Sequence, residues 1–247
     1  MSTNDFAVLK KLCCSNHFVC RGKAFFRVHG DGVFQVVKCE KVRHFPAYEI
    51  AIGLFSMYGE LRADWFTSPG CIPRYAVVEF EGKRSAVYSE KNGEVYYGRT
   101  ISLEHQISIL ESSVMSFLDE ITSQAHLAEA ICDLDKMTYA SIIWNDMLKY
   151  APFVASGNYA SARKVIQAIL DQHSFALERN RTFMSPQDFQ ADCLRTQAED
   201  YLLIQKLNMV EAGDQAVINE FLHANYVQNC KYARFAMFNK QRTGDNS

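Results

Sequence analysis

Several features that define common protein classes are scarce or missing in this 247-residue chain. No apolar run approaches the ~18–20 residues that a membrane-spanning helix needs. The first residues lack the basic segment followed by an apolar core that marks an export signal. We therefore expect a cytoplasmic protein that does not interact with membranes.

The eight cysteines include no Cys-x-x-Cys pair, and the seven histidines stand apart from one another. A structural zinc site needs ligands paired at short spacing. Disulfide frameworks belong mainly to small secreted chains, whereas the cytoplasm keeps thiols reduced. The sequence therefore predicts reduced, buried thiols and no metal site.

The sequence motifs of catalysis and of phosphate binding are also missing. Neither glycine-rich phosphate-binding loop, Gly-x-Gly-x-x-Gly or Gly-x-x-x-x-Gly-Lys-Ser/Thr, occurs in the sequence. The Gly-x-Ser-x-Gly motif of serine hydrolases and the His-Glu-x-x-His motif of zinc proteases are also missing. Gly30 and Gly32 lead from one expected strand into another, so no helix N-terminus follows them to hold a phosphate. The remaining catalytic candidate is a thiol nucleophile, Cys20 or Cys39, with His29 as its base. Any cysteine-rich chain offers such a pair by chance. We predict no catalytic residue and no cofactor, and an enzyme without a recognisable motif is the less favoured alternative.

The net charge of −2 is unevenly spread along the chain. Residues 1–45 carry eight Lys and Arg against three Asp and Glu, while residues 101–247 carry twelve against eighteen. Such an asymmetry affects which partners the protein attracts and how charged partners are steered towards it, rather than the fold.

The most regular stretch runs from Cys20 to Lys41 and predicts a β-hairpin after a short helix over residues 4–14. Two alternating runs, about 23–29 and 33–41, flank Gly30-Asp31-Gly32. A three-residue loop with a left-handed glycine places His29 opposite Val33. It gathers Phe26, Val28, Phe34 and Val36 on one face, which we expect to meet the core.

The other face of this hairpin carries Arg21, Lys23, Phe25, Arg27, His29, Gln35 and Val37. A solvated face, paired with the acidic helical half or with water, is the interpretation we favour. A protein partner or, through phosphate contacts and stacking on Phe25, a nucleic acid are the alternatives. The candidate binding residues are therefore Arg21, Lys23, Phe25, Arg27, Gln35 and, in the long irregular connection, Trp65, whose alternative role is to anchor that loop on the core.

Further alternating runs at 48–54, 75–80 and 85–89 extend this hairpin, and Asn92-Gly93 is a strong turn signal before the strand that follows. After Thr100 the apolar spacing becomes helical. Ser185 and Pro186 are a capping residue and a first-turn residue for one of these helices. We predict an α+β fold: one short helix and an antiparallel sheet of five or six strands over residues 1–100, then a helical bundle over 101–247 packed on or beside the sheet.

Residues 16–43 and the strand after them resemble the bacterial domain of unknown function 4304 family. The matching positions are Phe18, Arg21, Gly22, Phe25 or Phe26, Arg27, Val36 and Ile52-Gly53. The second strand departs from the family pattern, because it keeps only Lys41 of a Gln-Lys-Ser-like ending. The resemblance covers about residues 5–100 and implies the hairpin, but no activity, substrate or cofactor. From the sequence we favour a non-catalytic regulatory or interaction protein with a protein partner.

Overall fold

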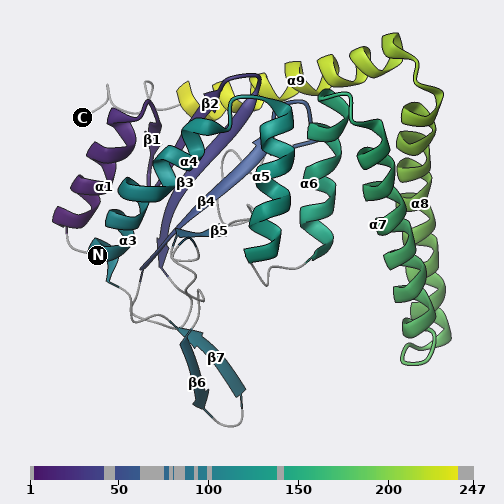
Figure 1. Ribbon diagram of the computed structural model, residues 1–247. Coiled ribbons are helices and arrows are strands. Elements are labelled where there is room, and N and C mark those ends of the chain that lie inside the picture. Colours follow the sequence, from purple (N-terminus) through teal and green to yellow (C-terminus); the bar gives the residue numbers. More distant parts are fainter. Residues whose placement is uncertain are drawn as a thin grey trace, which may run out of the picture.

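The computed structural model describes residues 3–41, 48–61, 75–77, 80, 87–91, 94–98, 102–137 and 142–238 (Figure 1). Its first part contains α1 (Thr3–Ser15), β1 (Val19–Arg21), β2 (Ala24–His29), β3 (Val33–Lys41), β4 (Tyr48–Ser56), β5 (Tyr75–Ala76), β6 (Val87–Lys91) and β7 (Glu94–Gly98). The second part is helical: α3 (Leu103–Ile109), the π-helical turn η3 (Leu110–Val114), α4 (Met115–Glu120), α5 (Gln124–Met137), α6 (Ile142–Ala155), α7 (Tyr159–Asn180), α8 (Pro186–Ala212) and α9 (Gln215–Phe238). The predicted α+β class is confirmed.

The sheet is an antiparallel meander in the order β1-β2-β3-β4-β5. His29 pairs with Val33 and Val28 with Phe34, as the three-residue loop predicts. Gly30 and Gly32 both have positive φ, at 51° and 63°, which is the left-handed conformation that glycine adopts without strain. The register of the hairpin is therefore confirmed.

Helices cover both faces of this sheet rather than one. On the first face, α1, α3, α4 and α5 share a core with Phe25, Val37 and Ile52. On the second face, α9 returns from the far end of the chain and packs over Phe26 and Phe34 (Figure 1). The expectation of a single covered face is wrong, since neighbouring residues of one strand are buried in opposite directions.

The strands after β4 are shorter and more separate than the sequence suggests. The run 75–80 forms a strand only at Tyr75–Ala76. The next hairpin pairs Lys91 with Glu94, as the turn signal predicts, but β6 and β7 form their own two-stranded sheet. Asn92 and Gly93 themselves lie outside the described residues, as does Trp65.

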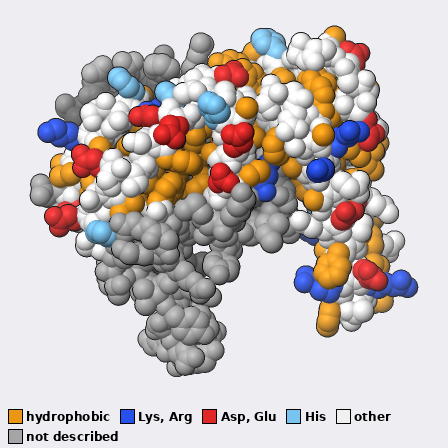
Figure 2. Space-filling view, in the orientation of Figure 1, with side chains coloured by type: hydrophobic (Ala, Val, Ile, Leu, Met, Phe, Trp, Pro, Cys, Tyr) orange, Lys and Arg blue, Asp and Glu red, His pale blue; other side chains and the backbone are white. Residues whose placement is uncertain are grey.

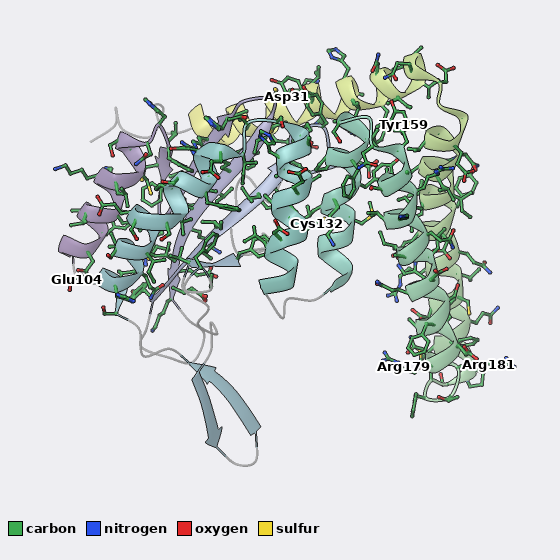
Figure 3. The ribbon with its side chains drawn as sticks, viewed as in Figure 1. Asp31, Glu104, Cys132, Tyr159, Arg179 and Arg181 are labelled. Atoms are coloured by element: carbon green, nitrogen blue, oxygen red, sulfur yellow. The ribbon has the colours of Figure 1, made fainter. Side chains whose placement is uncertain are left out.

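The remaining helices form a third apolar cluster beside the sheet. Tyr150 and Val154 of α6, Ile166 of α7, Leu203 of α8 and Ile218 of α9 are buried together there. Beyond this cluster, the antiparallel hairpin of α7 and α8 extends away from the body of the molecule (Figure 1). Arg179 and Arg181 lie at its tip (Figure 3).

Candidate functional site

The basic face of the first hairpin is largely an interior surface. Arg27 is only 6% exposed, and its guanidinium lies over the Phe18 ring with the carbon 4.4 Å from the ring centre. It donates to Gln35 Oε1 at 2.6 Å, to the Asn16 carbonyl at 3.0 Å and to Asp119 Oδ1 at 2.5 Å. Arg27 therefore joins the end of α1, two strands and the end of α4.

Phe25 and Gln35 are fully buried on the same face. Gln35 completes its hydrogen bonding by donating Nε2 to the Leu118 carbonyl at 2.6 Å. The expected pairing of this face with the acidic helical half is confirmed for Arg27, through Asp119. Its contact with water is wrong for Phe25, Arg27 and Gln35, which are buried, offer no surface to a partner and, for Phe25, no ring on which a base could stack. Val28, expected in the core, is 43% exposed.

Of the candidate binding residues that the structure describes, Arg21 and Lys23, at the edge of the sheet, reach the surface. Lys23 is exposed, with its ammonium 4.9 Å from the centre of the Tyr48 ring, and Arg21 is half-buried. A partner contact at these two residues stays a prediction.

One signal in the sequence indicates the double burial. Large apolar residues stand next to each other at Phe25-Phe26 and Val36-Val37, so both faces of β2 and β3 carry them. A strand buried on both faces reads as a continuous apolar run rather than an alternating one.

The structure separates the thiol and imidazole groups of the hairpin. His29 ends β2 opposite Val33, whereas Cys39 is opposite Ile50 towards the other end of β3. Cys20 of β1 is opposite Phe25, four residues before His29. Burial raises the pKa of Cys39 to about 11, so at neutral pH it is a thiol rather than a nucleophilic thiolate. Cys39 and Cys13 are buried, but Cys14 is exposed, so the expected burial holds for only some of the free cysteines.

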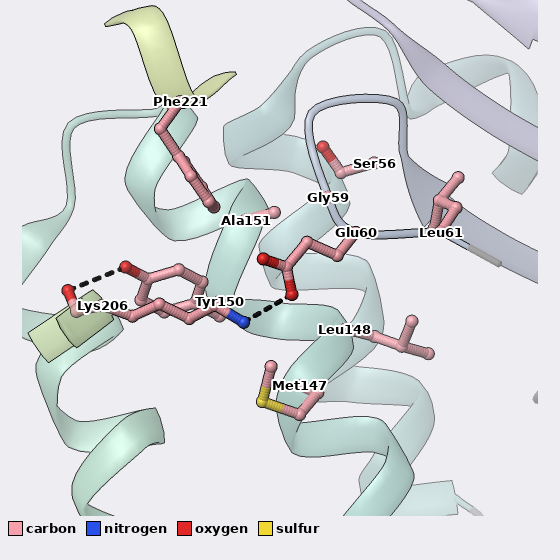
Figure 4. A pocket seen from close by; sticks show the side chains of 10 residues that line it. All are labelled: Ser56, Gly59, Glu60, Leu61, Met147, Leu148, Tyr150, Ala151, Lys206 and Phe221. Carbon is pink, nitrogen blue, oxygen red and sulfur yellow. Dashed lines mark hydrogen bonds and ion pairs between the residues drawn. The ribbon is translucent and has the colours of Figure 1, made fainter. Parts of the chain in front are cut away.

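A cavity of about 200 Å³ lies where the body of the molecule meets the helical hairpin (Figure 4). Ten residues line it: Ser56, Gly59, Glu60, Leu61, Met147, Leu148, Tyr150, Ala151, Lys206 and Phe221. Lys206 Nζ of α8 pairs with Glu60 Oε2 at 2.5 Å, and Tyr150 donates its hydroxyl to the Lys206 carbonyl at 3.0 Å. The first contact joins α8 to the loop after β4, and the second joins it to α6.

The surface that lines this cavity is mainly apolar. Its ten lining residues include no histidine or cysteine, and burial, with the nearby Glu60 carboxylate, raises the pKa of Tyr150. Tyr150 therefore keeps its proton and acts as a hydrogen-bond donor. Pockets for drug-sized ligands measure roughly 300–1,000 Å³, so the size suits a single side chain better than a small molecule.

The outer face of α8 carries a long row of exposed residues that we call the α8 seam. Its members are separated alternately by four and three residues: Gln187, Ala191, Leu194, Ala198, Tyr201, Gln205, Asn208 and Ala212. All eight are exposed, Leu194 and Tyr201 each to 62%. None carries a charge, although α8 has seven charged residues elsewhere. Residues at this spacing lie along one side of a helix, in the positions that face the neighbouring helix in a helix pair.

The inner side of the hairpin is, by contrast, polar towards its tip. His173 of α7 pairs with Asp200 of α8 at 2.7 Å, and Asn180 donates to Asp192 at 3.0 Å. Asp192 and Thr196 are buried there, while Leu194 faces outwards. Figure 2 shows hydrophobic side chains beside charged ones at the tip of the hairpin, where Phe183 is 83% exposed. The usual distribution of polar and apolar groups is thus reversed over this part of α8.

Comparisons of the chain with protein-family models, with curated proteins and with solved structures found no match. The resemblance to the domain of unknown function 4304 family accordingly stays a prediction. Among the described residues, no three His, Cys, Asp or Glu side chains are placed to hold a metal ion. No described helix is long and apolar enough to cross a membrane.

Proposed function

We propose that this chain is a non-catalytic cytoplasmic interaction protein that binds a protein partner through the α8 seam. The observation that carries the proposal is the row of eight exposed, uncharged residues at heptad spacing on a hairpin that extends from the body. The cores of protein interfaces are depleted of charge and enriched in aromatic residues. The seam has both properties, since it carries no charge and includes the aromatic Tyr201.

Two further observations support a partner at this face. Leu194 and Tyr201, each 62% exposed, lie within this uncharged row, and exposed apolar patches rimmed by polar residues mark interaction sites. The seven described cysteines are all free thiols. Free thiols agree with the reducing environment of the cytoplasm. A regulatory role, acting through the bound partner, fits a chain whose described cavity suits a side chain.

Site-specific photo-crosslinking in the native cells tests this proposal. The crosslinking residue p-benzoylphenylalanine replaces Tyr201, an aromatic exchange at an exposed position, and in a control chain it replaces Ala168, which is exposed on α7 outside the seam. We expect a covalent protein adduct from position 201 and none from position 168. The proposal fails if position 201 yields no adduct, or if both positions yield the same adducts.

A further inference from the structure

We propose that the cavity between α6, α8 and the loop after β4 binds one phenol ring, the group that forms the side chain of tyrosine. The inference goes beyond the proposed function, because none of the ten residues that line the cavity belongs to the α8 seam. It follows from the volume of the cavity, from the aromatic side chains in its lining and from the ion pair beside them.

The volume of the cavity, about 200 Å³, corresponds to a single aromatic ring with small substituents. An engineered cavity of about 150 Å³ in another protein, also lined by apolar side chains, binds benzene. The present cavity is larger than that one, which leaves room for a hydroxyl group and a methyl group on the ring. One substituted ring therefore matches the available space.

The apolar lining includes two aromatic side chains in contact. The rings of Tyr150 in α6 and Phe221 in α9 have their centres 6.5 Å apart and their planes inclined at 73°, so they meet edge to face. Met147, three residues before Tyr150, adds a thioether to the lining (Figure 4). Aromatic rings pack favourably edge to face with other rings and against the sulfur of methionine. This lining therefore suits a further aromatic ring better than an aliphatic chain.

The ion pair in the lining selects the polar group of the ligand. Lys206 Nζ pairs with Glu60 Oε2 at 2.5 Å, and the Lys206 side chain is only 13% exposed. An ammonium group has three hydrogens to donate, and among the described residues Glu60 is the acceptor that Nζ meets. A hydroxyl can accept from Lys206 and donate to Glu60, whereas a ligand carboxylate would be repelled by Glu60 and a ligand ammonium by Lys206. The ion pair therefore favours a neutral hydroxyl, which on an aromatic ring is a phenol.

An NMR titration of the purified full chain with p-cresol and with toluene tests this inference. p-Cresol is the tyrosine side chain without its backbone, and toluene is the same ring without the hydroxyl. We expect p-cresol to bind with a dissociation constant of about 1 mM or lower. It should bind about tenfold more tightly than toluene, because its hydroxyl meets charged groups. Nuclear Overhauser contacts from the ring protons to the Met147 methyl group would place the ligand in the cavity.

A cavity-filling variant and its matched control separate this site from unspecific binding. Met147→Trp should abolish the binding of p-cresol, because the larger side chain occupies the space of the ring. Met184→Trp, the same exchange at a residue that is 36% exposed and does not line the cavity, should leave the binding unchanged. Circular dichroism of both variants checks that the fold is kept.

A second variant tests the role of the ion pair. Lys206→Met keeps an apolar side chain of similar length and removes the ammonium. The tenfold preference for p-cresol over toluene should then fall to near equality, while the affinity for toluene stays unchanged. If Lys206 served only to hold the cavity open, the affinities for both compounds would fall together.

N-acetyltyrosinamide, added in a separate titration, distinguishes the two sources of a phenol ring. Binding comparable to that of p-cresol identifies the side chain of a tyrosine in a protein as the ligand, and binding of p-cresol alone identifies a free phenol. Three results overturn the inference: no binding of p-cresol, bound p-cresol without contact to Met147, or equal affinities of the wild type for p-cresol and toluene. Crosslinking from position 201 does not depend on this cavity, so each proposal can fail without the other.

Discussion

At the scale of single residues, Arg27 shows how one side chain joins parts of the chain that are distant in sequence. Its partners come from the end of α1, from β3 and from the end of α4. Each of these groups is a strong acceptor, and a buried acceptor left without a donor costs free energy. The guanidinium, with its fixed fan of donors, is suited to serve several acceptors at once.

We predict that Arg27→Met destabilises the protein by about 3 kcal/mol, because it leaves Gln35 Oε1 and the Asn16 carbonyl without their donor. Asp119→Asn should cost less than about 1 kcal/mol, since an exposed ion-pair partner contributes little. The Asp119 side chain is 51% exposed, so water can replace its lost contact. Urea unfolding of both variants measures the difference. Equal losses from the two substitutions would contradict this account of Arg27.

The sequence predicts the register around Arg27 but not its environment. Alternation and the two turn glycines determine which residues face each other, since a slip by one residue would reverse every side chain. They do not determine whether the polar face meets water or a helix. Asp119, which pairs with Arg27, and the Leu118 carbonyl, which accepts from Gln35, lie 92 and 83 residues away in sequence, and no local pattern connects them.

At the scale of elements, the turn between β2 and β3 is where the sheet meets the helical half. Asp31 donates its backbone N–H to the Thr122 carbonyl at 2.8 Å, and the Gln124 side chain donates to the Asp31 carbonyl. Tyr58 donates its hydroxyl to Asp31 Oδ1 at 2.7 Å. Burial, together with this contact to Asp31, raises the pKa of Tyr58 to about 12, so the donor is present throughout the neutral range.

We predict that Gly30→Ala destabilises the protein by about 3 kcal/mol or more, because a backbone overlap cannot be relieved by a side-chain rotation. A Cβ at Gly30 would lie 2.0 Å from the Thr122 carbonyl oxygen. Gly22→Ala is the matched control: φ is +59° there, but nothing lies within 4 Å of the added atom. Its cost should be about 1–2 kcal/mol, the strain of a left-handed residue alone. Thermal unfolding compares the two, and similar losses would show that the contact with Thr122 is unimportant.

Helix ends are the elements that the sequence predicts best. Ser185 accepts the backbone N–H of Asp188, Pro186 begins α8, and Gly213 ends it with φ of 64°. Each of these residues acts through its own backbone or side chain within one turn, so the signal is local. The short β1 and the π-helical turn η3 have no comparable local signal in the sequence.

At the scale of the whole molecule, α9 brings the C-terminal part of the chain back to the sheet formed by its N-terminal part. This last described helix covers the second face of the sheet, where it packs Ala233 among Phe26 and Phe34. Asn229, buried in the same contact, donates to the Met57 carbonyl at 2.9 Å and to the Gly59 carbonyl at 2.6 Å. The periodicity of α9 predicts a helix but not its position, because the residues that it meets belong to strands formed some two hundred residues earlier.

We predict that a chain ending at Gly213 loses cooperative unfolding and binds the dye ANS, while a chain ending at Phe238 behaves as the full chain does. The shorter chain exposes the apolar face formed by Phe26, Phe34, Val36, Phe55 and Met57, and it leaves the Met57 and Gly59 carbonyls without the Asn229 donor. A sheet that is apolar on both faces needs a cover on each, and an uncovered face of this kind gives a compact state without fixed packing. Urea denaturation followed by tryptophan fluorescence and by circular dichroism compares the two chains, since coincident transitions indicate two-state unfolding. If the chain ending at Gly213 keeps a single coincident transition without binding ANS, α9 is an accessory to the fold. If that chain instead shows separate transitions and binds ANS, the helical half and the sheet depend on each other. The molecule then acquires its stability only when its last described helix packs against the sheet.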